Sequence, residues 1–390
     1  MRVVDVPAAL PNEPVLATAL IYEKFRRAEP VVAGQGFEVL RVLFESASAS
    51  DADADAANDH FVFPMFVPPG GPFQEVVIIL NGLNDSSYRK FFPWAASIAR
   101  SGVPALIFPS AFLMNRRPRD WISPTATERA FQARLQVAPD TASPINAVLS
   151  LRVAQNPRAL LQDAVRTAQD LRQLTRLASE GGLVRIQPGA RCHFLGYSLG
   201  GYLALALKLH GHLSDGSKIV TFCAGASSDG ATAVGLDPIS PFILDRDATG
   251  VLLRDVDALR ESAGQHAGIE ATLVELFTGT SSPTRERIRE LGSELFVIAG
   301  QADRIIPARG IEHNLGRIDA TLPLGIHEYP FNLTVYEGAG IARAIARSHC
   351  VLPEFEPVFR EFLGLVWQAL ALRPNATATQ RSDPRSQTSC

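Results

Sequence analysis

The stretch that most constrains the fold is residues 193–202, which read His-Phe-Leu-Gly-Tyr-Ser-Leu-Gly-Gly-Tyr. An apolar run leads into a Gly-x-Ser-x-Gly motif centred on Ser198, and an alternating Leu/Ala run follows at 203–207. This order predicts a strand, a sharp turn and a helix. The turn needs Gly196 and Gly200, because a β-carbon two residues from the serine would collide with the neighbouring strand or helix. The strained turn directs the Ser198 hydroxyl out of the sheet.

The same turn predicts half of an oxyanion hole. The backbone N–H of Leu199 opens the following helix and faces the same space as the Ser198 hydroxyl. A chain with this glycine content contains Gly-x-Ser-x-Gly by chance in ~10% of cases, so the strand and helix around the motif are needed to support it. The alternative interpretation is a tight strand–helix turn with no chemistry.

In this context the motif resembles the nucleophile turn of the α/β-hydrolase superfamily of serine esterases, lipases, thioesterases and peptidases. The resemblance implies an α/β fold: a mostly parallel central sheet of about eight strands, with helices on both faces and a helical cap. We expect one domain at 1–372, with its core at 36–224 and 293–372 and the cap inserted at 225–292. The polar tail at 373–390 is expected to be disordered.

Composition narrows the classes of partner and cofactor. The formal net charge is −3, which gives no basic footprint for nucleic acid. The four cysteines, at 192, 223, 350 and 390, lack the paired spacing of a zinc site or a disulfide framework. No signal-peptide segment and no membrane-spanning stretch is evident, which predicts a cytoplasmic protein. We expect no metal or organic cofactor, and the sequence does not indicate an oligomeric state.

Residues 76–80, Val-Val-Ile-Ile-Leu, form an apolar run typical of a strand buried on both faces of a parallel sheet. Asn81, Gly82 and Leu83 follow it directly. In the hydrolase superfamily the corresponding loop often reads His-Gly, and the residue after that glycine supplies the second oxyanion N–H. The resemblance therefore assigns this N–H to Leu83, with Asn81 where histidine is common. The alternative is an ordinary Asn-Gly turn.

A second loop, at 110–121, follows a predicted strand at 104–109. It should reach the carboxyl edge of the sheet, where open α/β folds bind ligands. We expect Arg116 and Trp121 to line the pocket or to contact an acidic group of the substrate. The alternative is a solvated loop with one anchoring tryptophan. This segment faintly resembles an uncharacterised bacterial branch of the hydrolases. The other residues expected around the substrate are Asn81, Gly82 and Tyr197.

A third loop carries the candidate acid of a catalytic triad. A predicted strand at 294–300 ends in glycine, and Asp303 follows three residues later. In the superfamily a strand, a glycine, two residues and an aspartate mark the triad acid, so the resemblance assigns that role to Asp303. A carboxylate at a strand end is able to accept the Nδ1–H of a histidine and fix its tautomer. The alternative is an aspartate that caps a turn.

The candidate base is a histidine after Asp303, because the superfamily orders its triad as serine, acid and histidine. His313 lies too close to Asp303. His327 follows a predicted strand at 319–326, which leaves room for one short helix and one strand after the acid. We therefore favour His327. His349, which precedes the expected C-terminal helix, is the alternative.

These residues predict a serine hydrolase that cleaves an ester or thioester of a small or medium acyl group. Ser198 attacks the carbonyl, His327 transfers the proton, and Asp303 orients His327. The N–H groups of Leu83 and Leu199 bind the oxyanion. Two alternatives stay open: an acyltransferase or thioesterase in a biosynthetic pathway, and a catalytically silent binding protein on a hydrolase scaffold.

Overall fold

The computed structural model describes most of the chain between residues 36 and 372. The described ranges are 36–46, 56–83, 85, 88–118, 121, 123–141, 144–227, 244–261, 268–303, 305–325 and 356–372. The predicted tail at 373–390 and both candidate bases, His327 and His349, lie outside these residues.

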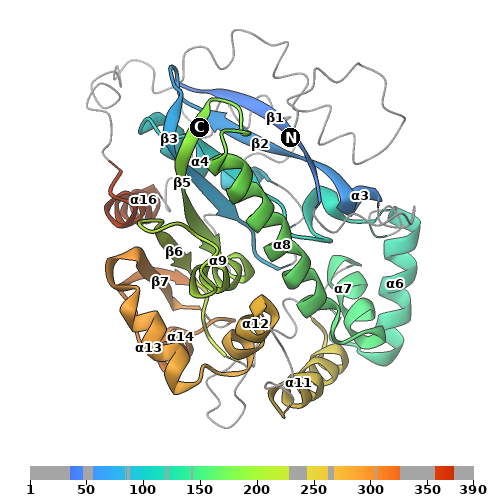
Figure 1. Cartoon of the computed structure of the whole chain (residues 1–390). Coiled ribbons are helices and arrows are strands. Elements are labelled where there is room, and N and C mark those ends of the chain that lie inside the picture. The colour runs from blue at the N-terminus through green and yellow to red at the C-terminus, as the bar shows by residue number, and fades with distance from the viewer. Residues whose placement is uncertain are drawn as a thin grey trace.

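An eight-stranded sheet forms the centre of the structure, in the spatial order β1-β2-β4-β3-β5-β6-β7-β8 (Figure 1). Strand β2 is antiparallel to both of its neighbours, and the six strands from β4 to β8 in that order are parallel. The strands are β1 (Glu38–Glu45), β2 (His60–Val67), β3 (Phe73–Leu80), β4 (Ala105–Phe108), β5 (Ile186–Tyr197), β6 (Ile219–Phe222), β7 (Leu295–Ala302) and β8 (Ala320–Gly325).

This arrangement confirms the α/β-hydrolase fold predicted from the sequence. The predicted strands at 76–80, 104–109, 294–300 and 319–326 correspond to β3, β4, β7 and β8, with differences of a few residues at their ends. Residues Val76–Leu80 of β3 are completely buried. Their unbroken apolar pattern has the expected cause, because parallel strands in such a sheet are covered on both faces.

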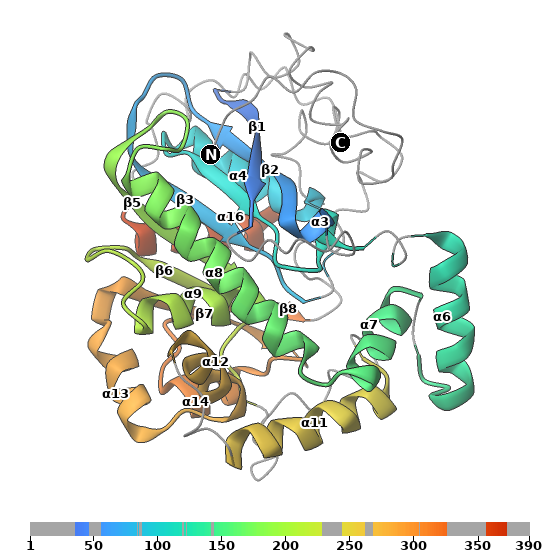
Figure 2. The ribbon, with the colours of Figure 1, turned by 45° about the vertical axis from the view of Figure 1, so that its right-hand side comes forward.

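Helices cover the two faces of the sheet (Figures 1 and 2). One face is covered by α8 (Ala159–Ser179) and α9 (Leu199–Leu209), whose apolar side chains join one core cluster. The other face is covered by α4 (Phe92–Arg100) and α16 (Glu356–Leu370), which join a second cluster. In that second cluster the Trp94 ring lies 4.8 Å from the Phe362 ring and 5.9 Å from the Phe222 ring, which ties α4 to α16 and to β6.

A further group of helices lies beyond the carboxyl ends of the parallel strands (Figure 2). It contains α6 (Pro124–Val137), α7 (Pro144–Gln155), α11 (Arg246–Glu261) and α12 (Gly268–Thr278). Helix α7 packs against α11, and α12 packs against α8 and α9. Arg134 of α6 forms a bidentate ion pair with the buried Asp245, at 2.6 and 2.8 Å, just before α11 begins. Two separate stretches of chain therefore build this layer. The division into a core and a cap at 225–292 stays a prediction.

Three α-helices and three 3-10 helices, which are labelled η, complete the description. They are α3 (Ala56–Asp59), η2 (Arg89–Phe91), η3 (Met114–Arg116), α13 (Ser282–Glu290), η6 (Gly292–Glu294) and α14 (Ala308–Leu315). Within the described ranges, no helix combines the length and the hydropathy that crossing a bilayer requires.

Candidate active site

Ser198 occupies the strained turn between β5 and α9 that the sequence predicts. Its backbone has φ 51° and ψ −118°, a conformation that costs a non-glycine residue about 1–3 kcal/mol and persists only where the surroundings enforce it. Two hydrogen bonds enforce it here: the Ser198 N–H donates to the Phe222 carbonyl at 3.0 Å, and the Gly201 N–H donates to the Ser198 carbonyl at 2.9 Å. The serine side chain is left half-buried at the wall of a cavity.

The glycines of the motif are required by close backbone contacts. A β-carbon on Gly200 would lie 2.5 Å from the Leu80 β-carbon and 2.6 Å from the Leu80 carbonyl oxygen. A β-carbon on Gly196 would lie 2.5 Å from the Gly200 carbonyl oxygen. Any side chain at either position would therefore push α9 away from β3 and β5, and the turn at Ser198 would open.

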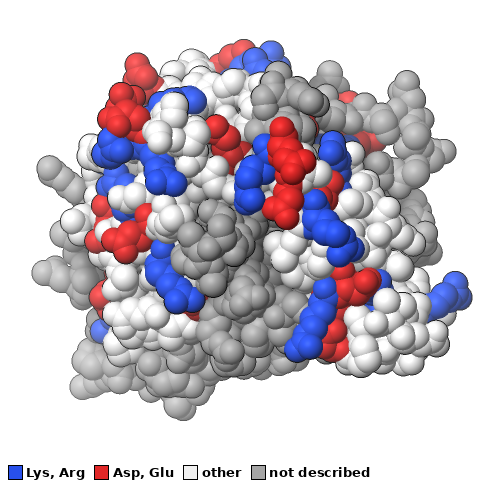
Figure 3. Space-filling model, turned by 90° about the horizontal axis from the view of Figure 1, so that it is seen from below, with Lys and Arg blue, Asp and Glu red and all other residues white. Residues whose placement is uncertain are grey.

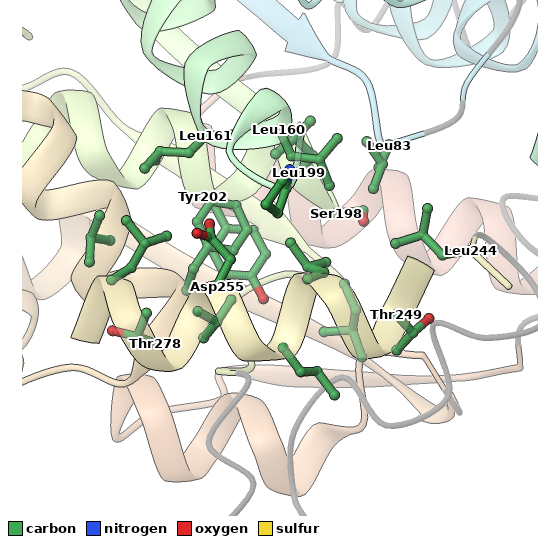
Figure 4. Close-up of a pocket in the computed structure, with 18 of the residues that line it drawn as sticks. Leu83, Leu160, Leu161, Ser198, Leu199, Tyr202, Leu244, Thr249, Asp255 and Thr278 are labelled. Atoms are coloured by element: carbon green, nitrogen blue, oxygen red, sulfur yellow. The ribbon is translucent and has the colours of Figure 1, made fainter. Parts of the chain in front are cut away.

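The loop after β3 lies directly against this turn. A β-carbon on Gly82 would be 2.8 Å from the Tyr197 ring and 3.2 Å from the Ser198 β-carbon. Leu83 and Leu199 line the cavity together with Ser198, one on each side of it (Figure 4). As the first residue of α9, Leu199 has no carbonyl four residues earlier within the helix to accept its N–H. The structure thus brings Ser198 and both predicted oxyanion residues to one wall.

Side chains tie this loop in place. The buried Asn81 donates from Nδ2 to the Gly82 carbonyl at 2.8 Å and accepts from the Ser110 N–H at 2.9 Å. The Asp85 carboxylate accepts from the Gly82 N–H at 2.7 Å and forms an ion pair with Lys90. Asn81 therefore shapes the loop from within and does not line the cavity.

The Asp85–Lys90 pair is a feature that the sequence analysis missed. Burial raises the pKa of the Asp85 carboxyl, and the Lys90 ammonium opposes that rise. Burial likewise lowers the pKa of Lys90, and Asp85 opposes the fall. The Lys90 Nζ also lies 4.4 Å from the centre of the Tyr197 ring, a cation–π distance. An acidic residue just after a predicted oxyanion loop, with a lysine five residues on, was the available signal.

Asp303 lies where β7 ends, and it is buried. Its Oδ1 accepts the N–H of Ile305 at 2.8 Å and the N–H of Ile306 at 3.0 Å. Ile305 and Ile306 both line the cavity beside Ser198. An aspartate that only caps this turn would make the same two bonds, so these bonds do not distinguish a triad acid from a turn cap.

The described histidines occupy other places. His193 on β5 is buried, and its Nδ1 accepts the Lys218 N–H at 3.0 Å while its Nε2 lies 3.6 Å from the Glu75 carboxylate. Burial lowers the pKa of His193, and Glu75 opposes the fall. His313 is exposed on α14. None of the described residues forms a hydrogen bond with the Ser198 hydroxyl. The register of β7 and β8 pairs Ala302, the residue before Asp303, with Gly325 at the end of β8.

The cavity beside Ser198 has a volume of about 100 Å³ and is mostly apolar. Its wall is built by α8, α9, α11, α12 and the turn after Asp303 (Figure 4). Leucines dominate the wall, and Phe277 stacks on Tyr202 with ring centroids 4.7 Å apart. On the face of the molecule below α11, the basic and acidic side chains of the described residues are interspersed, and those residues form no large area of one sign (Figure 3). The cavity lining is therefore suited to an apolar ligand group.

The structure corrects the expectation for Arg116. Its side chain is completely buried, and its guanidinium donates to Asp170 at 2.7 Å and to the Asn58 carbonyl at 3.0 Å. Burial lowers the pKa of Arg116, and Asp170 opposes the fall. The guanidinium also stacks 4.0 Å from the centre of the Phe61 ring. Arg116 is thus committed to the interior and does not line the cavity beside Ser198.

The two aromatic residues expected around the substrate also lie away from the cavity. Trp121 packs on Phe112 at 5.6 Å between ring centroids, with the Arg152 guanidinium 4.9 Å from its own ring, as an anchoring tryptophan would. Tyr197 is buried behind the turn, where its ring packs against Trp94 and Phe222. Neither residue lines the cavity, because the helices beyond the strand ends supply its wall.

Solved structures that are similar to this chain include two esterases and one protein whose name states no activity. Esterase Est22 has a TM-score of 0.46 and 13% identity, with 95% of this chain and 95% of that chain covered. Brefeldin A esterase, described as a bacterial homologue of human hormone-sensitive lipase, has a TM-score of 0.47 and 14% identity, with 94% and 89% covered. TT1662 from Thermus thermophilus has a TM-score of 0.43 and 15% identity, with 86% and 100% covered.

Comparison with curated proteins finds no match. Among protein families, the family of unknown function DUF6051 matches residues 40–259. The matched segment runs from β1 into α11 and includes Ser198, Leu83 and most of α11. Because the match covers more than half of the chain, this protein belongs to the DUF6051 family.

Proposed function

We propose that this protein is a serine hydrolase that cleaves an ester or thioester through an acyl-enzyme intermediate. The observation that carries the proposal is Ser198, held at φ 51° at the apex of a strand–helix turn and set in the wall of an apolar cavity. Strained backbone of this kind is retained where a function requires it. Of the six non-glycine residues with a positive φ in the described part of the chain, Ser198 alone lines the cavity.

The proposed reaction uses groups that follow four strands in the sequence, β3, β5, β7 and β8. The Ser198 Oγ attacks the carbonyl carbon while His327 takes its proton, and Asp303 fixes the His327 tautomer. The N–H groups of Leu83 and Leu199 stabilise the negative charge on the carbonyl oxygen. The tetrahedral intermediate then expels the alcohol or thiol, which receives the proton from His327. Water repeats the sequence on the acyl-enzyme, and the acid is released. The reaction needs no metal or organic cofactor.

The register of the last two strands supports His327 as the base. Ala302 of β7 is paired with Gly325 of β8, and Asp303 and residue 326 are the next residues along the two strands. The end of β8, two residues before His327 in the sequence, therefore lies at the edge of the sheet where Asp303 follows β7. No described strand ends shortly before His349 in the sequence, and His349 is the alternative that the experiment must separate.

A fluorophosphonate probe, which labels activated serines, tests the proposal. We expect the wild-type protein to be labelled, and labelling to be lost in Ser198→Ala and in His327→Ala. Ser214→Ala, an exposed serine after α9, serves as the matched control and should label like wild type. Loss in His349→Ala instead of His327→Ala would reassign the base. A folded wild-type protein that is neither labelled nor active on short esters would favour the silent binding protein.

A further inference from the structure

The apolar cavity beside Ser198 contains two polar atoms that nothing in the described structure satisfies. The Oδ2 atom of Asp255 and the Oγ1 atom of Thr249 are both buried, and neither has a hydrogen-bond partner among the described residues. Both residues line the cavity and both lie on α11. The hydroxyl of Tyr202, another lining group, is satisfied, because it donates to the Ala226 carbonyl.

Asp255 is positioned so that its two carboxylate oxygens have different surroundings. Its side chain is 12% exposed, and Oδ1 lies 3.3 Å from the Nε of Arg158, which is itself about half exposed at the rim. The other oxygen, Oδ2, is the buried atom without a partner. Figure 4 shows the carboxylate rising from α11 toward Tyr202, while Thr249 lies at the other end of the helix near Leu244. Thr249 and Asp255 lie six positions apart on α11, which corresponds to roughly 9 Å along the helix axis.

A buried carboxylate oxygen without a donor is costly to the fold. Leaving such a group unsatisfied costs more than leaving a neutral acceptor unsatisfied, and native proteins retain few examples without a reason. The neighbours of Asp255 on this side of α11 are Leu252, Val256 and Leu259, which also line the cavity. A leucine at position 255 would suit such a wall better, and the contact with Arg158 accounts for Oδ1 but not for the buried Oδ2.

We propose that this cavity selects an acyl group that carries a hydroxyl along its chain, with Asp255 Oδ2 as the acceptor of that hydroxyl. The inference rests on the proposed function and deepens it by naming the substrate class. A carboxylate only accepts, so its partner must be a donor. The donor is a neutral hydroxyl, because Arg158 already balances the charge of Asp255 from the rim. The apolar wall around it contacts the carbon chain.

The test measures binding in a protein that cannot turn over. Ser198→Ala is titrated with methyl hexanoate and with methyl ω-hydroxyhexanoate, and dissociation constants are read by ligand-observed NMR. We expect the hydroxylated ester to bind about 10- to 100-fold more tightly, the range for a hydrogen bond to a charged acceptor. Adding Asp255→Leu should bring the two affinities together. Adding Asp257→Leu, an exposed aspartate on the same helix, should leave the preference intact.

The other outcomes overturn the inference. Equal binding of the two esters to Ser198→Ala would do so, and so would a preference that survives in Asp255→Leu. Tighter binding of methyl ω-aminohexanoate than of the hydroxyl ester would replace the hydroxyl by an ammonium group. If Asp255→Leu fails to fold, Asp255→Asn, which keeps the shape and weakens the acceptor, should give an intermediate preference. Because no turnover is needed, a wild-type protein that resists the fluorophosphonate would refute the hydrolase alone.

Discussion

The Asp85 carboxylate accepts the Gly82 N–H at 2.7 Å, one residue before Leu83, whose own N–H is proposed to bind the oxyanion. A side chain that does not line the cavity thus fixes the backbone next to the proposed oxyanion donor. The carboxylate is itself held by Lys90, which lies over the Tyr197 ring behind the nucleophile turn. These contacts link the loop that carries Gly82 and Leu83 to the turn at Ser198 through Asp85, Lys90 and the Tyr197 ring.

Removing this acceptor should slow the reaction of Ser198 more than it changes the binding of esters. We expect Asp85→Ala to reduce kcat and the rate of fluorophosphonate labelling about 10- to 100-fold with little change in KM, because a small displacement of a catalytic group has effects of this size. Asp85→Asn keeps an acceptor and should lose less. Asp85→Ala/Lys90→Met should recover the stability lost with a buried ion pair but not the labelling rate. Wild-type labelling by Asp85→Ala would remove Asp85 from the positioning of the loop.

The backbone N–H of Leu83 is tested by a substitution that removes it, compared with one that removes only the side chain. We expect Leu83→Pro to reduce the labelling rate of Ser198 by about 10²–10³, the usual effect of losing one oxyanion donor. Leu83→Ala keeps the N–H, removes the side chain from the cavity wall and should stay within a few-fold of wild type. Thermal melts establish that both variants fold. Equal rates for the two variants would show that this N–H takes no part.

Glycine at position 200 should be far less replaceable than glycine at position 364, although both lie in helices. A β-carbon on Gly200 would lie 2.5 Å from Leu80, so Gly200→Ala should reduce the free energy of unfolding by about 3 kcal/mol or more. A β-carbon on Gly364 of α16 meets nothing within 4 Å, and Gly364→Ala should add about 0.5–1 kcal/mol. Urea unfolding measures both. Similar effects of the two substitutions would contradict the close packing of α9 on β3.

Arg116 should matter to the stability of the protein and not to its chemistry. Arg116→Met removes the guanidinium that pairs with the buried Asp170 carboxylate at 2.7 Å, and we expect a loss of about 3–5 kcal/mol in the free energy of unfolding. Arg116→Met/Asp170→Leu should recover much of that loss. At temperatures where the single variant is folded, its labelling rate should equal that of wild type. A specific loss of labelling in folded Arg116→Met would restore Arg116 to the site.

Asp163 provides a pH-dependent prediction. Burial raises its pKa from 3.8 to about 6, although Arg152 opposes the rise with two hydrogen bonds. The folded protein therefore binds this proton more strongly than the unfolded chain does. Its contribution to stability is present below pH 3.8 and is lost as the pH rises to about 6, by on the order of 3 kcal/mol.

The comparison with Asp163→Asn isolates that contribution from those of other carboxyl groups. Urea unfolding of both proteins at a series of pH values gives the difference in their free energies of unfolding. This difference, wild type minus variant, should fall as the pH rises through the window and should level off above it. A difference that stays constant, or that grows with pH, would be inconsistent with a raised pKa at Asp163.

The parts of the fold that the sequence predicts are those set by neighbouring residues. The strand, turn and helix around Ser198 follow from the spacing of its glycines and from the apolar runs on each side. The strands β3 and β4 follow from unbroken buried runs, and Asp303 was found because its loop directly continues a strand. In each case the signal and the structure lie within about a dozen consecutive residues.

The parts that the sequence did not predict depend on packing between distant segments. Arg116 was expected near the substrate because its loop leaves the carboxyl edge of the sheet, but its partner Asp170 lies in the middle of α8 and draws it inside. Asp255 stands among leucines on α11, and no local pattern separates it from a surface aspartate such as Asp257. Only the packing of α11 beside Ser198 shows which of the two faces inward.

The cavity and the nucleophile turn are built from different material. Ser198, Leu83 and Asp303 lie in loops that directly follow strands. Helix α11, which is not part of the sheet, supplies six of the residues that line the cavity. We therefore expect the proposed reactive groups and the side chains proposed to select the acyl chain to be separable by mutation. A library randomised on the inner face of α11 would change which ester enters while leaving the turn and its hydrogen bonds intact. We therefore expect the selectivity of this protein to be open to redesign through α11 alone.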